Sequence, residues 1–102
     1  MWRQVDGGLT KMTIGSENGN IIADEASDLG ARITIEEGGK IAPYSITCGI
    51  YGLFCHTVFF GSHTEAINSY EEMKNEIQAF LLNNSLTDTE AIDWCESFTN
   101  KY

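Results

Sequence analysis

The spacing of apolar residues changes once along this chain of 102 residues, at Ser62. Before Ser62, apolar and polar residues alternate in short runs separated by turns, which is typical of β-strands with one buried face. After Ser62, apolar residues recur at intervals of three and four, which is typical of amphipathic helices. This order predicts an α+β fold in which an antiparallel sheet is followed by helices.

A single domain is predicted over residues 1–102. Within it, residues 9–60 are expected to form five strands that are connected in sequence as an antiparallel meander. They cover residues 9–16, 20–26, 31–37, 40–48 and 53–60. Asn18-Gly19 is a strong signal for a two-residue hairpin turn, and Gly38-Gly39 has the composition of another. Residues 1–8 precede the first predicted strand and are expected to form a loose N-terminal arm.

The register of the hairpin around Gly38-Gly39 can be checked against the charge and polarity of its two strands. A two-residue turn would pair Glu37 with Lys40, which carry opposite charges. Directly opposed residues share a face of the sheet. In this register both strands separate independently into one polar set and one largely apolar set, and the apolar face comprises Ala31, Ile33, Ile35, Ala42, Tyr44, Ile46 and Cys48.

The strand predicted over residues 53–60 is apolar on both sides. A four-residue turn at residues 49–52 would pair Cys48 with Leu53 and turn the odd-numbered residues of the strand toward the core. The even-numbered residues would then face the other way. A turn one residue longer or shorter exchanges the two sets, and a strand without a polar side does not resist this slip.

Two helices are predicted within residues 63–100, and they are expected to pack on one face of the sheet. Each begins with a capping box, Ser62 with Glu65 and Thr87 with Glu90. An antiparallel sheet with helices on one face leaves its second face open to solvent or to a partner.

The charge of the chain restricts its partners. The net charge is −9, and residues 63–102 contribute eight acids but only two bases. Such a chain repels phosphate backbones and anionic membrane surfaces, whereas it attracts basic proteins. No apolar run reaches the roughly 20 residues that span a bilayer, no signal peptide is recognisable, and the cysteine count is odd. These features predict a cytoplasmic protein with reduced thiols.

Catalytic and metal sites are not predicted. Cys55 and His56 resemble a nucleophile beside its base, but neighbours on a strand point to opposite faces and therefore do not form a dyad. The cysteines and histidines lack the spacings of zinc sites, and no glycine-rich cofactor loop is present. We therefore expect no cofactor, and a binding protein is favoured over an enzyme.

The second face of the sheet is the candidate functional surface because it combines polar residues with an apolar cluster. Its predicted members are Arg32, Thr34, Glu36, Thr47, Phe54, His56, Val58 and Phe60. The favoured hypothesis is a protein–protein interface that forms a homodimer or binds a partner, possibly a basic one, and that loses dimerisation on Phe54→Asp or Phe60→Asp. Two alternatives are cover by the N-terminal arm through Trp2 and Val5, and a small-molecule groove around His56 and Arg32.

Overall fold

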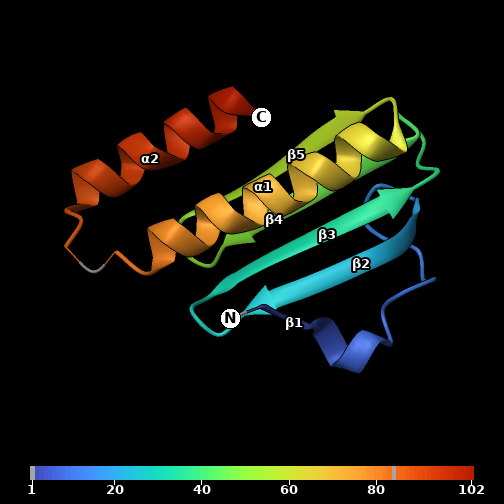
Figure 1. The fold of residues 1–102 in the computed structure, drawn as a ribbon, viewed down its shortest axis with the longest axis horizontal. Helices are drawn as coiled ribbons and strands as arrows, with labels where there is room; N and C mark the ends of the chain where they lie inside the picture. The colour runs from blue at the N-terminus through green and yellow to red at the C-terminus, as the bar shows by residue number, and fades with distance from the viewer. Residues whose placement is uncertain (1, 84) are drawn as a thin grey trace.

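The computed structural model describes residues 2–83 and 85–102 (Figure 1). A five-stranded antiparallel sheet in the order β1-β2-β3-β4-β5 precedes two helices, which confirms the predicted fold class. The strands are β1 Trp2–Gln4, β2 Asn20–Ser27, β3 Ala31–Glu37, β4 Tyr44–Ile50 and β5 Phe54–Phe60. The helices are α1 His63–Leu81 and α2 Asp88–Lys101, and a short 3-10 turn, η1 Val5–Gly8, follows β1.

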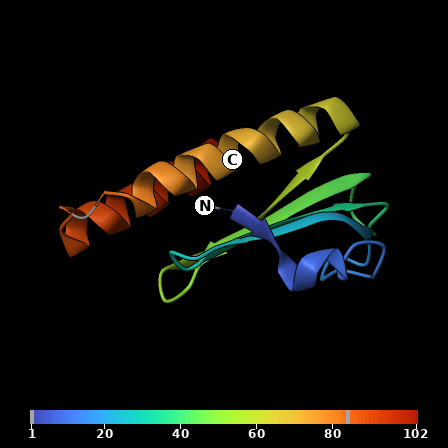
Figure 2. The ribbon, with the colours of Figure 1, turned by 60° about the horizontal axis from the view of Figure 1, so that its bottom comes forward.

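The two helices lie on one side of the sheet, and the segment after β1 lies on the other (Figure 2). We call these sides the helix face and the second face. The core forms on the helix face, where α1 covers β3 and β4. Its fully buried members include Ile33, Ile35, Ile46, Met73 and Ile77.

The N-terminal part of the sheet differs from the prediction. Residues 9–16 do not form a strand, and the edge of β2 is taken by β1, in which Trp2 pairs with Ser27. The two-residue turn predicted at Asn18-Gly19 does not form. Ile14 bridges to Asn20, and Gly15 N donates a hydrogen bond to Gly19 O at 2.9 Å, so residues 15–19 form a longer loop. The strand fails because Met12 adopts a φ of 68°, which interrupts an extended conformation.

The hairpin of β3 and β4 has a longer connection than the two-residue turn predicted for it. Glu37 pairs with Tyr44 rather than with Lys40, so residues 38–43 form the loop. Pro43 has no N–H to donate to a ladder, and the strand begins directly after it. The shift is four residues, an even number, and every side chain within β3 and β4 therefore keeps its predicted face, whereas Ala42 lies in the loop.

The pairing of β4 with β5 also differs from the prediction, and this difference changes which side chains of β5 lie at the candidate site. Ile50 pairs with Phe54 and Cys48 pairs with His56 across a three-residue loop, in which Gly52 has a φ of 77°. The predicted pairing of Cys48 with Leu53 is therefore wrong by an odd number of residues. As a result, each side chain of β5 lies on the face opposite to its predicted one.

Both predicted helix starts are confirmed. Ser62 Oγ accepts a hydrogen bond from Glu65 N, and the reciprocal capping box of Thr87 and Glu90 is complete. In α2, Trp94 stacks on Phe80 of α1 at 4.2 Å between ring centroids, and Phe98 contacts Phe54 of β5. Within residues 2–83 and 85–102, neither helix has the combined length and apolar character needed to cross a bilayer.

Candidate functional site

A groove of about 900 Å³ lies on the second face. Its floor is formed by residues of β3 and β4 that include Arg32, Thr34 and Thr47. One wall is formed by residues 10–16 and the other by residues 50–55, the end of β4 and the loop that leads into β5. Five of the eight predicted site residues line the groove: Arg32, Thr34, Glu36 and Thr47 at its floor, and Phe54 in its second wall.

A half-buried ion pair joins β2 to this floor. Asp24 of β2 has a fully buried side chain, which accepts hydrogen bonds from Arg32 Nε at 2.9 Å and Arg32 Nη2 at 2.6 Å. Thr34 Oγ1 donates a third hydrogen bond at 2.9 Å. Burial by itself raises the pKa of Asp24, but the bonds from Arg32 and Thr34 outweigh it and hold the pKa below its ordinary value. Arg32 is thus fixed as a cation in the groove.

Glu36 joins the floor of the groove to its first wall. Its side chain is buried, and its carboxylate accepts hydrogen bonds from the backbone N–H groups of Glu17 and Gly19, both at 3.1 Å. A side chain at Gly15 would collide with this carboxylate, because a Cβ there would overlap Glu36 Cδ. Glu36 therefore holds the segment 15–19 against the second face.

Four of the predicted site residues, including Phe54, have their side chains on the helix face. Phe54, Val58 and Phe60 pack against the core, and Phe54 makes edge contacts with Trp94 and Phe98. His56 is partly buried there, opposite Cys48. The prediction that His56 and Arg32 lie across one groove is therefore wrong. The observed register of β4 and β5 differs from the predicted one by an odd number of residues, and this places the two side chains on opposite faces.

Three residues of β5 occupy the second face in their place: Cys55, Thr57 and Phe59. The Thr57 hydroxyl lies 3.2 Å from that of Thr47, and Phe59 is 40% exposed. The composition of β5 did not indicate which of its sides lies on the second face, since both sides contain aromatic residues. Gly52, with a φ of 77°, lies in both the predicted and the observed loop and therefore did not distinguish the two registers.

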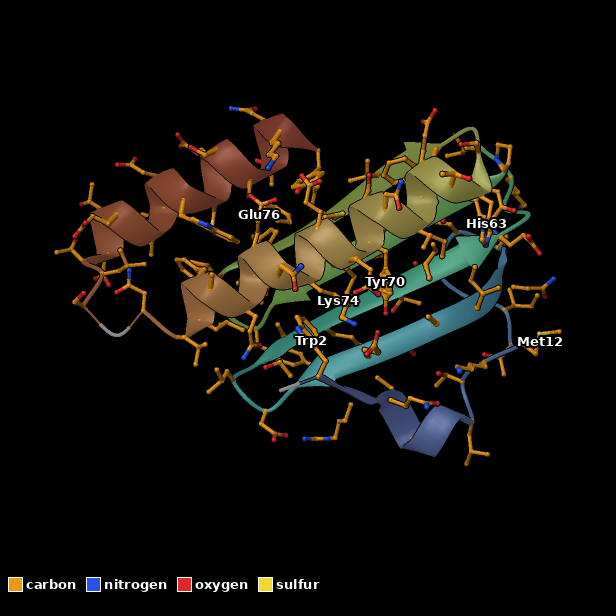
Figure 3. The ribbon with its side chains drawn as sticks, viewed as in Figure 1. Trp2, Met12, His63, Tyr70, Lys74 and Glu76 are labelled. Atoms are coloured by element: carbon orange, nitrogen blue, oxygen red, sulfur yellow. The ribbon has the colours of Figure 1, made fainter. Side chains whose placement is uncertain are left out.

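The first wall of the groove was also missed from the sequence. Within residues 10–16, Ile14 is 65% exposed and lines the groove, whereas the side chain of Met12 points away from the sheet (Figure 3). Trp2 lies on the helix face instead, where the Lys74 ammonium is 6.0 Å from its ring centroid. The alternative in which Trp2 covers the second face is therefore wrong.

A second polar cluster joins α1 to β2 on the helix face (Figure 3). Glu25 Oε1 accepts hydrogen bonds from the Tyr70 hydroxyl at 2.7 Å and from Lys74 Nζ at 2.8 Å. Burial acts to raise the pKa of Glu25, but these two bonds prevail and lower it. The cluster satisfies its own polar groups, so we assign it to the attachment of α1.

Metal-ligating groups are not gathered anywhere in the described part of the chain, where no three His, Cys, Asp or Glu side chains could hold one ion. Comparison with protein-family models, with curated proteins and with solved structures found no match. The function is therefore argued from the geometry of the second face.

Proposed function

We propose that this protein is a binding module that acts through protein–protein contacts on its second face and self-associates there. The observation that carries this proposal is the set of exposed apolar side chains on this side of the sheet. Ile14, Tyr51 and Leu53 line the groove, and Phe59 lies on the second face outside its lining. Ile14 is 65% exposed, Tyr51 78%, Leu53 37% and Phe59 40%. Contiguous apolar surface with polar groups beside it is typical of interaction sites.

The distribution of charge supports a second copy as the occupant of this face. The groove is lined by one base, Arg32, and one acid, Glu36. The helices on the opposite side carry eight acids and two bases. Two copies that meet through their second faces keep these acidic helices on the outside, at the largest separation, whereas any contact between the helical layers brings like charges together.

The test is the oligomeric state in solution, measured by light scattering at tens of micromolar protein. We expect a wild-type dimer and a folded monomer for Phe59→Asp. Leu82→Asp is the matched control, because Leu82 is 63% exposed at the end of α1, and this variant is expected to remain a dimer. A monomeric wild type, or a dimeric Phe59→Asp, would overturn the proposal. Phe54→Asp and Phe60→Asp are unsuitable, since they place a charge under the helices.

A small-molecule ligand in the groove is the second candidate. The volume of about 900 Å³ lies in the range of ligand pockets. Arg32 uses Nε and Nη2 on Asp24, and within the described residues its Nη1 has no hydrogen-bond partner. A thermal-shift screen of metabolites tests this candidate: a true groove ligand stabilises wild type and His56→Ala equally but loses its effect in Leu53→Asp. A ligand that depends on His56 would contradict it.

We place the protein in the cytoplasm. The side chains of Cys48, Cys55 and Cys95 are free thiols, which is the usual state in a reducing compartment. Burial raises the pKa of Cys48 to about 12, so this thiol is protonated and inert at neutral pH.

A further inference from the structure

The two edges of the sheet differ in how well they are protected. The β1 edge has three residues, one of which is Arg3 in an ion pair with Asp28, and the chain turns away into η1 directly afterwards. Short length and charge are the common means by which proteins prevent unwanted strand pairing. The β1 edge is therefore protected.

The β5 edge has none of these protections. The strand has seven residues without a charged side chain, a proline or a register shift, and within the described residues it pairs with β4 alone. Its outward N–H and C=O groups are therefore free to pair with another strand. We propose that this edge accepts an extended segment of a partner protein, uncharged or basic, as a sixth strand. This proposal does not depend on the contacts proposed for the second face.

Helix α2 marks the position of this sixth strand. In Figure 1, α2 lies beside α1 and beyond β5, so that the helical layer extends past the edge of the sheet. Its aromatic contacts with the sheet are those of Trp94 and Phe98 with Phe54. A strand added about 4.8 Å beyond β5 would lie next to the flank of α2 and continue the two-layer arrangement.

The flank of α2 that is turned away from α1 suits such a strand. Ile92 and Cys95 are three residues apart and share one side of the helix. Neither lines the furrow between α1 and α2, which is bordered by Glu90 and Trp94, and Ile92 is 54% exposed. This apolar flank would contact every second side chain of the added strand.

The occupant is an extended segment rather than a second copy of the fold. A two-fold pairing of β5 with its equivalent would carry the helical layer of the second copy into the space beside β5 that α2 already occupies (Figure 1). The charge of α2 selects the composition of the segment, because α2 carries four acids and one base. An acidic segment would be repelled, whereas an uncharged or basic one would not.

Amide hydrogen exchange of the full chain, with a short synthetic peptide of alternating lysine and valine as the probe, tests the proposal. Every second amide of β5 is expected to exchange rapidly in the free protein and to slow by about tenfold or more when the peptide binds. The same peptide with alternate backbone amides methylated is the control, since it cannot donate the ladder hydrogen bonds. Ile92→Glu is expected to weaken peptide binding, while Leu82→Glu, also at an exposed apolar position, is expected to leave it unchanged.

Three results would overturn the proposal. The first is unchanged exchange of β5 at millimolar peptide. The second is equal binding of the methylated peptide or of an alternating glutamate–valine peptide, which would indicate contact by side chains or by an unrelated surface. The third is protection of every β5 amide in the free protein that is lost on dilution, which would show that a second copy already occupies the edge.

Discussion

At the scale of single residues, the best-defined feature of the second face is the carboxylate of Asp24. It is fully buried and accepts three hydrogen bonds, two of them from one guanidinium. Removing one partner of such a pair is costly because the other is left incompletely paired. Arg32 is 46% exposed, however, so water compensates part of that loss.

Asp24→Asn is therefore expected to lower the free energy of unfolding at pH 7 by about 2 kcal/mol. The folded pKa of Asp24 lies below its ordinary 3.8, so its contribution is fully present above about pH 4 and is lost as the pH falls through the folded pKa. Urea unfolding from pH 7 down to pH 2 measures the difference between wild type and variant. A difference that stays constant over that range would contradict the assignment.

Glu36 provides a second test at this scale. Glu36→Ala removes the carboxylate oxygen that accepts the backbone N–H groups of Glu17 and Gly19. We expect a loss of about 1–2 kcal/mol in unfolding free energy. We also expect faster hydrogen exchange in residues 15–19, and a mainly local effect. Global unfolding without a local change would contradict the role of Glu36 as the attachment of this segment.

At the scale of elements, the register of β5 decides which of its aromatic residues support the core. Phe54 contacts Trp94 and Phe98, whereas Phe59 is on the second face and is 40% exposed. Because both are phenylalanines on the same strand, comparing the effects of their substitution on stability tests the register.

Phe54→Ala is expected to cost about 3 kcal/mol of unfolding free energy, because it removes a ring from a packed aromatic cluster. Phe59→Ala is expected to cost about 1 kcal/mol or less, since its ring is already partly in water. Urea denaturation of both variants under the same conditions makes the comparison. A larger loss for Phe59→Ala would contradict the observed pairing of β4 with β5.

At the scale of the whole molecule, the two helices differ in how firmly they are attached. Helix α1 buries Ala66, Tyr70, Met73 and Ile77 against the sheet, whereas α2 has one fully buried residue, Phe98. The C-terminal end of α2 is held by charged and polar contacts. Lys101 pairs with Glu72 and Glu76, and the Tyr102 hydroxyl lies within hydrogen-bond distance of both carboxylates.

We therefore expect α2 to open more readily than α1, since elements with few buried contacts open locally at lower free energy. Trp94→Ala is expected to accelerate amide exchange throughout α2 by about tenfold or more while α1 remains protected. Hydrogen exchange with residue resolution measures this. Equal acceleration in both helices would show that the two open as one unit.

The sequence by itself determined the kind and order of the main elements. Alternation marked β3, helical spacing marked α1, and the capping residues Ser62 and Thr87 marked where the helices begin. These are local signals that depend on neighbours a few residues apart. The second-face positions of Arg32, Thr34, Glu36 and Thr47 also followed from the sequence, because the error in the register of β3 and β4 was even and left the faces unchanged.

Only the tertiary structure decided which side of β5 faces the groove. Side chains on a strand alternate with a period of two, so a three-residue shift in pairing exchanged Phe54 and His56 for Cys55 and Phe59. A strand that is apolar on both sides has no local preference between these outcomes. The helices decide between them, because the packing of Trp94 and Phe98 on Phe54 exists in one register alone.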